Sequence, residues 1–273
     1  MQHAPRTDSA PQASATSRLS ARGLRLAYDR RVVVDSLSID IPDGGFTVIV
    51  GPNACGKSTL LKAFARTLTP AAGSVLLDGR PLESYRSKAV ARTLALLPQS
   101  PIAPEAITVR DLVGRGRYPH QGLLRQWSPA DERAVDDALA ATGNTSLAER
   151  HVAELSGGQR QRVWMAMVLA QQTELLLLDE PTTFLDIAHQ YDVLELCARM
   201  HAEGRTLVAV LHDLNQAARY ATNLVVMKDG AIVDQGEPGR ILSPELLEHV
   251  FGLSCVIIPD PVTGTPLVVP RRP

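Results

Sequence analysis

The sequence predicts an α/β fold: a parallel sheet, an antiparallel β subdomain in front of it and a helical segment inserted into it. Alternating apolar residues over 19–50 are typical of half-buried strands. Apolar strands and helices then alternate as far as residue 211, an order that indicates a parallel sheet covered on both faces. Between about 106 and 154 the apolar residues switch to helical spacing, which predicts the insert.

Composition limits the size, charge and location of the protein. Its 273 residues, 45% of them apolar, suffice for one large α/β domain or two small ones, with a sizeable core. Lys and Arg total 28 and Asp and Glu total 29, so the formal net charge is −1; this argues against nucleic-acid binding, which requires a basic surface. We expect no spanning helix, which needs roughly 18 apolar residues, and no secretory signal. The three widely spaced cysteines suit a reducing cytosol without a disulfide or zinc site.

The first strands carry their apolar residues at every second position. These residues are Leu24, Leu26 and Tyr28 in one strand and Leu37, Ile39 and Ile41 in the next. The stretch Phe46–Val50 is continuously apolar, which favours a strand buried on both faces. A glycine-rich turn and a helix from Lys57 follow it, and further strands are expected at 75–77 and 94–97.

One helix of the insert has clear start and stop signals. Ser128 is expected at its N-cap and Pro129 at its first position, and Asp131 can complete a capping box. Gly143 is expected to end it.

The rest of the pattern defines the remaining elements and the domain limits. The spacing predicts helices over 157–171 and about 187–203, strands over 175–178 and 206–211, and a hairpin of Cys255–Ile258 with Pro266–Val269. We therefore predict a disordered tail over 1–18, one domain over 19–254 with a helical part at about 100–160, and a β extension over 255–273.

A phosphate-binding loop follows the buried strand. Gly51-Pro-Asn-Ala-Cys-Gly-Lys-Ser58 fits the pattern G-x-x-x-x-G-K-[ST] in full. Gly51 and Gly56 allow a tight turn whose N–H groups face phosphates, Lys57 supplies charge for the β- and γ-phosphates, and Ser58 offers a hydroxyl to Mg²⁺. We expect ATP to be bound by Gly51, Pro52, Asn53, Ala54, Cys55, Gly56, Lys57, Ser58 and Thr59.

Two acidic residues end the apolar run Leu175–Leu178. Asp179 is expected to bind Mg²⁺ together with Ser58. Glu180 is expected to polarise the water that attacks the γ-phosphate. The alternative is that Glu180 is a solvated strand end.

A second motif decides the family. Leu155-Ser-Gly-Gly-Gln159 lies between the phosphate loop and Asp179 and opens a helix. Alone it is an ordinary helix cap, but in this order it resembles the signature motif of ATP-binding-cassette (ABC) ATPases. The resemblance implies a P-loop NTPase core in an ABC ATPase cassette. It also implies phosphate contacts from a helix N-terminus that comprises Ser156, Gly157, Gly158 and Gln159.

Four further residues match motifs of this family, and each has a plainer alternative. Tyr28 resembles the aromatic residue that stacks on adenine, or it is a core tyrosine. Gln99 resembles the glutamine that senses both the metal and the γ-phosphate, or it is a surface residue. His212 resembles the switch histidine that contacts the γ-phosphate, or it is structural. Asp186 resembles the loop that crosses to a second subunit, or it caps a helix.

Ala54 is a departure, because the family most often has glycine there. We expect alanine to be tolerated only if its φ is negative, so nucleotide affinity is in question. Its neighbour Cys55 is either a reactive thiol near a positive helix start or an inert small side chain.

The resemblance implies an assembly and a location. Two copies pack head to tail with ATP between the phosphate loop of one and the signature motif of the other. Two integral-membrane permease subunits and an extracytoplasmic capture protein complete the importer, and the chain is peripheral on the cytoplasmic face of the membrane.

Two stretches, Gly114–Gln121 and Glu180–Gln190, resemble the subfamily that imports iron(III)–siderophore complexes. The first lies where a membrane subunit would dock, and its basic residues Arg115, Arg117 and His120 either serve that contact or form a solvated loop. Haem and cobalamin stay as alternative cargoes, and an exporter stays as an alternative direction. A soluble ABC ATPase acting on DNA or ribosomes would carry long coiled-coil inserts or two cassettes. A P-loop kinase or GTPase would lack the signature motif.

Overall fold

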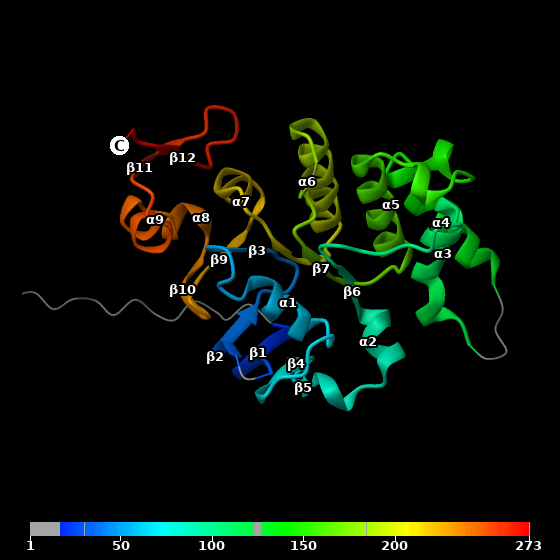
Figure 1. Ribbon diagram of the computed structural model, residues 1–273, viewed down its shortest axis with the longest axis horizontal. Coiled ribbons are helices and arrows are strands. Elements are labelled where there is room, and N and C mark those ends of the chain that lie inside the picture. Colours follow the sequence, from blue (N-terminus) through cyan, green and yellow to red (C-terminus); the bar gives the residue numbers. More distant parts are fainter. Residues whose placement is uncertain (1–16, 30, 123–126, 184, 273) are drawn as a thin grey trace, which may run out of the picture.

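A six-stranded sheet in the order β10-β9-β3-β8-β7-β6 forms the centre of the molecule (Figure 1). The computed structural model describes residues 17–29, 31–122, 127–183 and 185–272. Five strands are parallel, and β10 pairs antiparallel with β9 at one edge. The strands are β3 (Phe46–Val50), β6 (Leu94–Leu97), β7 (Leu175–Asp179), β8 (Thr206–Val210), β9 (Asn223–Lys228) and β10 (Ala231–Gly236). The continuously apolar strand β3 is buried along its whole length, as predicted.

One face of this sheet is covered by a helix and by a second, antiparallel sheet. The helix is α1 (Lys57–Phe64), and the second sheet has the order β2-β1-β4-β5. Its strands are β1 (Leu19–Tyr28), β2 (Arg31–Ile41), β4 (Ala72–Leu77) and β5 (Arg80–Pro81). Ile49 of β3 contributes to this core, together with the alternating apolar residues of β1 and β2. The predicted antiparallel β subdomain is confirmed.

The other face is covered by helices. They are α5 (Gly157–Ala170), α6 (Ile187–Ala202), α7 (Leu214–Tyr220), α8 (Pro238–Ile241) and α9 (Pro244–Phe251). Val48 and Val50 of β3 pack with this layer, whereas Ile49 points to the opposite face, as the period of two in a strand requires. The sheet is thus buried on both sides.

The helical insert lies beyond the β6 edge of the sheet (Figure 1). It comprises α3 (Val109–Gly114), the 3₁₀ helix η2 (Arg115–His120), α4 (Pro129–Ala141), η3 (Thr145–Leu147) and η4 (Val152–Glu154), and it packs on α5. The capping box of Ser128 and Asp131 is present at the start of α4, and Gly143 adopts φ +66° just beyond its end. Two short helices, η1 (Leu82–Ser84) and α2 (Ser87–Thr93), precede β6.

Both ends of the described chain are attached to the fold. The predicted hairpin is confirmed as β11 (Cys255–Pro259) and β12 (Pro266–Pro270), and Asn215 of α7 exchanges two hydrogen bonds with the backbone of Val268. At the other end Arg18 pairs with Asp78 at 2.7 Å. Most of the predicted tail, residues 1–16, lies outside the described residues. Within the described part of the chain, no helix has the length and apolar character needed to cross a bilayer.

Candidate nucleotide site

The phosphate loop joins the end of β3 to the start of α1, and two glycines make its path possible. A Cβ at Gly51 would lie 2.2 Å from the carbonyl oxygen of Met227, so no other residue fits there. Gly56 is the N-cap of α1 and has φ +107°, a conformation that L side chains rarely adopt. The loop therefore brings the backbone N–H groups at the α1 N-terminus to the carboxyl edge of the sheet.

Lys57 closes the loop from inside. Its buried Nζ donates to the carbonyl oxygens of Gly51 and Pro52, both at 2.8 Å. The ammonium group therefore lies within the loop, where a bound phosphate would replace these carbonyls as its partner.

Ala54 does not meet the condition that we set for it from the sequence. We expected alanine to be tolerated here only with a negative φ, but its φ is +62°, in the left-handed region. The cost of that conformation for an L residue is about 1–2 kcal/mol.

Cys55 has the properties of an inert side chain. It is 4% exposed, and burial raises the pKa of its thiol despite the nearby charge of Lys57. A buried thiol with a raised pKa holds little of the reactive thiolate, so the structure favours the unreactive alternative.

Ser58 and Asp179 form a candidate metal site. The Ser58 hydroxyl donates to Asp179 Oδ1 at 2.8 Å, joining the first turn of α1 to the end of β7. Burial raises the pKa of Asp179, and the Ser58 hydrogen bond opposes that shift. A hydroxyl and a buried carboxylate are hard oxygen ligands, which suit Mg²⁺ bound together with substrate phosphates.

Three side chains hold Glu180, one from its own segment and two from the loops after other strands. Its Oε2 accepts from Gln99 Nε2 at 2.6 Å and from Thr183 Oγ1 at 3.0 Å, and its Oε1 lies 2.7 Å from His212 Nε2. The side chain is 9% exposed, and the backbone has φ +53°. Strained backbone held by such a network is typical of functional sites. The carboxylate is therefore fixed in one orientation beside the phosphate loop.

These residues surround one hollow of about 330 Å³. Its lining includes Asn53, Ala54, Gly56, Lys57, Ser58, Thr59, Glu180 and His212, with Tyr28, Arg31 and Val33 on the side of the antiparallel sheet. Tyr28 is 44% exposed, so it is not a core tyrosine and its ring is available to a ligand. Gln99 and Asp179 line an adjoining hollow that shares Tyr28.

The signature residues are not part of either hollow. The Ser156 hydroxyl caps α5 by accepting from Gln159 N, and the Gln159 side chain bonds back to Ser156 N, so Ser156–Gln159 form a capping box. Asp186 caps α6 by accepting from the backbone N–H of His189. Within one chain the structure does not bring the signature motif or Asp186 to the phosphate loop.

Sequence reasoning missed two residues of the site. Thr183 bonds Glu180, and its position three residues after that acid is a local signal we did not use. Arg31 lines the hollow because the hairpin of β1 and β2 pairs it with Tyr28.

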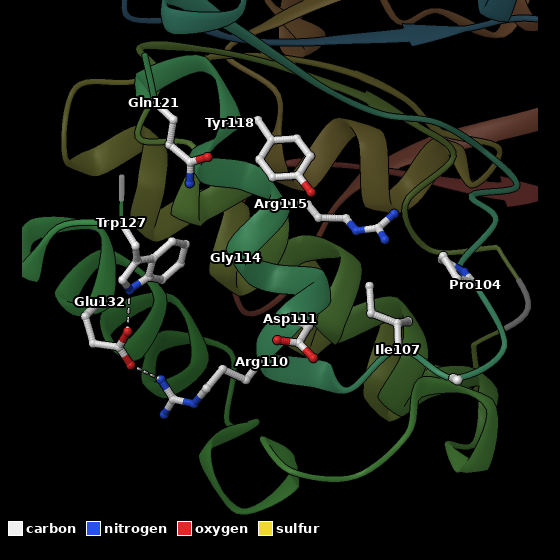
Figure 2. A pocket seen from close by; sticks show the side chains of 11 residues that line it. Pro104, Ile107, Arg110, Asp111, Gly114, Arg115, Tyr118, Gln121, Trp127 and Glu132 are labelled. Atoms are coloured by element: carbon white, nitrogen blue, oxygen red, sulfur yellow. Dashed lines mark hydrogen bonds and ion pairs between the residues drawn. The ribbon is translucent and has the colours of Figure 1, made fainter. Parts of the chain in front are cut away.

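The predicted docking segment lines a different hollow, of about 630 Å³ (Figure 2). Arg115 and Tyr118 are on its wall, and Tyr118 is 58% exposed. Arg117, by contrast, is 5% exposed, and the ring of His120 lies 2.8 Å from the carbonyl oxygen of Gln171 through Nε2. The three basic residues therefore form neither one docking patch nor a solvated loop.

Comparison with known proteins identifies the family of the chain. The sequence model of the ABC transporter family matches residues 34–183, more than half of the chain. The ferric enterobactin transport ATP-binding protein FepC of Escherichia coli (strain K12) is 56% identical over 93% of this chain and 94% of its own length. The petrobactin import ATP-binding protein FpuD of Bacillus anthracis is 51% identical over 93% of each. A solved metal-chelate type ABC transporter in an inward-facing conformation has a TM-score of 0.80 and 29% identity, covering 94% of this chain and 98% of that chain. Identity at this level over nearly the whole length shows that the chain belongs to the ABC transporter family, among its ATP-binding proteins.

Proposed function

We propose that this chain binds MgATP and hydrolyses it as the ATPase subunit of an importer for an iron(III)–siderophore complex. One observation supports the chemistry above all: Glu180 is held by Gln99, Thr183 and His212 at the rim of the phosphate loop. A carboxylate fixed in this way can orient a water and accept its proton while the γ-phosphoryl group is transferred.

The other residues position the substrate. Lys57 and the N-terminus of α1 bind the phosphates, and Tyr28 stacks on the base from the exposed side. Ser58, Asp179 and Gln99 would hold Mg²⁺, which neutralises the charge that develops on the phosphate oxygens. His212 binds the γ-phosphate side of the nucleotide while its Nε2 fixes Glu180.

The active unit is a homodimer. Ser156, Gly158 and Asp186 lie outside the hollow of their own chain, so a single subunit leaves the γ-phosphate open to water. The partner's signature helix would close that side with donors at a helix N-terminus. ATP then stabilises the closed pair, because it binds that state more tightly than the open one.

Coupling to transport requires membrane partners. The hollow lined by Arg115 and Tyr118 is exposed on the helical insert and accepts the cytoplasmic part of a permease subunit. Two such subunits and an external capture protein complete the assembly, which places this chain on the cytoplasmic face of the membrane.

The cargo is proposed from similarity. FepC is named a ferric enterobactin transport ATP-binding protein and FpuD a petrobactin import ATP-binding protein. A further relative that is 50% identical, YusV of Bacillus subtilis (strain 168), is named a probable siderophore transport system ATP-binding protein, which supports the siderophore class.

Purification from membranes tests the proposal. The tagged chain is extracted from the membranes of the organism that produces it. The complex is then reconstituted in lipid vesicles, with ATP on the side of the membrane that carries this chain. We expect integral-membrane subunits to co-purify and ATP hydrolysis to rise when the capture protein is loaded with a ferric siderophore. Co-purification of ribosomes or DNA instead, or stimulation by haem or cobalamin alone, would contradict the proposed class or cargo.

A further inference from the structure

The inner side of η2 is fastened to the helices behind it by one buried arginine. The Arg117 side chain is 6% exposed. Its Nε donates to Asp131 Oδ1 at 2.9 Å, and its Nη1 donates to the carbonyl oxygen of Ala170 at 2.7 Å and to Gln172 Oε1 at 2.8 Å. One guanidinium group thus joins η2 to the first turn of α4 and to the last turn of α5.

The backbone of η2 is also in direct contact with α5. A Cβ at Gly116 would lie 2.2 Å from the carbonyl oxygen of Met167, so only glycine permits this approach. Two residues after Tyr118, His120 Nε2 lies 2.8 Å from the carbonyl oxygen of Gln171, just beyond the end of α5. Contacts from Gly116, Arg117 and His120 therefore fix η2 to the C-terminal end of one helix.

The outer side of η2 faces the hollow instead. Figure 2 shows Arg115 and Tyr118 projecting from η2 beside Trp127 and Gln121, in the hollow that we assign to the permease. From the other flank, Lys88 and Arg92 of α2 donate to the carbonyl oxygens of Gln121 and Pro119. The helix η2 is thus held by α4 and α5 on one side and by α2 on another, and its remaining side is exposed to the hollow.

We call η2, with its exposed residues Arg115 and Tyr118, the docking wall. The two ends of α5 connect this docking wall to the nucleotide site. The N-cap of α5 is Ser156 of the signature motif, so the helix runs from the signature to the contacts of Arg117. Beyond its C-terminal end, Gln171 donates to the carbonyl oxygens of Ala91 and Leu94, at the start of the strand that leads to Gln99. Because a helix is a rigid element, a displacement of η2 at the C-terminal end of α5 moves the signature residues at its N-terminal end.

We infer that Arg117 is a positioning residue that makes the docking wall and the signature helix move as one body, so that its loss uncouples ATP hydrolysis from transport. The inference rests on the proposed function. Its physical basis is the geometry of the guanidinium group: a planar fork reaches acceptors on α4, on α5 and just beyond the end of α5 at once, which the point charge of a lysine cannot do. Without the fork, η2 can shift against α5 while the nucleotide site stays intact.

Two variants separate coupling from folding. Arg117→Lys keeps the buried charge opposite Asp131 but loses the fork, whereas Gly116→Ala keeps every charge and forces the backbone of η2 away from Met167. Arg150→Lys is the matched control, because Arg150 pairs with Glu154 on the surface of the same insert, with 47% of its side chain exposed.

The transporter complex is purified with each variant, reconstituted in vesicles and assayed for ferric siderophore accumulated per ATP hydrolysed. The isolated cassette is assayed for basal ATP hydrolysis and for its melting temperature. We expect both test variants to keep basal hydrolysis within about threefold and to retain the permease, while accumulation per ATP falls at least fivefold. The control should keep the wild-type ratio.

The outcomes are distinguishable. If the wild-type vesicles do not accumulate the chelate, the proposed function fails and this inference with it. If the wild type transports and either folded test variant keeps the wild-type ratio, only the inference is overturned. If Arg117→Lys does not fold, Gly116→Ala decides alone, and a wild-type ratio in that variant refutes the coupling role.

Discussion

Replacement of Glu180 by glutamine separates its chemical role from its structural one. The carboxylate accepts on Oε2 from Gln99 and Thr183, and its Oε1 faces the Nε2 of His212. A glutamine can keep its oxygen toward the two donors and turn its NH₂ group toward His212, whose neutral ring can carry its proton on Nδ1 and accept. All three hydrogen bonds survive, so we expect the free energy of unfolding to change by less than about 1 kcal/mol.

The chemical effect should be much larger. Proton transfer by a positioned base contributes roughly 10²–10⁴-fold, so turnover should fall by that factor, equivalent to about 3–5 kcal/mol of transition-state stabilisation. Binding of ATP should be kept, because none of the groups that would hold the phosphates is removed. The ATP complex should then accumulate as a closed dimer.

Three measurements on Glu180→Gln test this reasoning: phosphate release, nucleotide affinity and size-exclusion chromatography with MgATP. The matched control is Glu154→Gln, since Glu154 pairs with Arg150 on the surface. Turnover within threefold of wild type would refute the role of Glu180 as the base. Loss of ATP affinity together with a large fall in melting temperature would show instead that the glutamine had disrupted the hydrogen-bond network.

Three further perturbations have expected outcomes. Lys57→Ala removes the only ammonium group that is hydrogen-bonded within the phosphate loop among the described residues, so ATP should bind roughly 10–100-fold more weakly in a fluorescence titration. The control is Lys228→Ala, which removes an ammonium group bonded to the carbonyl oxygen of His249 and should not change the affinity for ATP. Ala54→Gly removes the strain of an alanine in the left-handed region but adds the backbone entropy that glycine loses on folding. The first effect is the larger, so the free energy of unfolding should rise by about 0.5–1 kcal/mol in thermal melts, and a fall would contradict the φ of +62°. Burial raises the pKa of Asp131, but the hydrogen bonds from Ser128 and Arg117 outweigh it and hold that pKa below its usual range. The stability that ionised Asp131 gives the fold is therefore complete above its unfolded pKa of about 3.9 and is lost as pH falls through the lower folded pKa. The melting temperature of Asp131→Asn should therefore depend less on pH than that of the wild type between about pH 5 and 2.

The parts of the site that depend on neighbouring residues could be predicted from the sequence, whereas those that depend on how the loop closes on itself could not. The strand, loop and helix around Lys57 follow from an apolar run, a spaced glycine pattern and a helix start, all within 20 residues. The positive φ of Ala54 could not be predicted, because it depends on the path of the whole loop around Lys57 and no single-residue propensity contains that path. The C-terminal hairpin was predicted because its turn carries Gly264, which has φ +72°.

The helical insert shows the same limit. The cap of α4 was predicted from Ser128 and Asp131, because a capping box spans only three residues. The role of Arg117 was not, because its three acceptors lie 14, 53 and 55 residues away. A run of basic residues in a polar segment suggests an exposed patch, and only packing against α5 shows that one of them is buried.

The placement of the candidate catalytic groups supports the proposal that hydrolysis needs more than one chain. Asp179 ends β7 and Glu180 follows it, and Gln99 and His212 come just after the neighbouring parallel strands β6 and β8, so their positions are fixed by a sheet that is buried on both faces. The signature residues begin a helix whose opposite end is fixed to the helical insert. In the proposed mechanism the sheet keeps the candidate base and metal ligands in place through a cycle, while the signature helix moves with the docking wall. A nucleotide bound at the sheet would then be enclosed only when a second copy brings its helix start to the γ-phosphate, and we propose that the permease senses that approach.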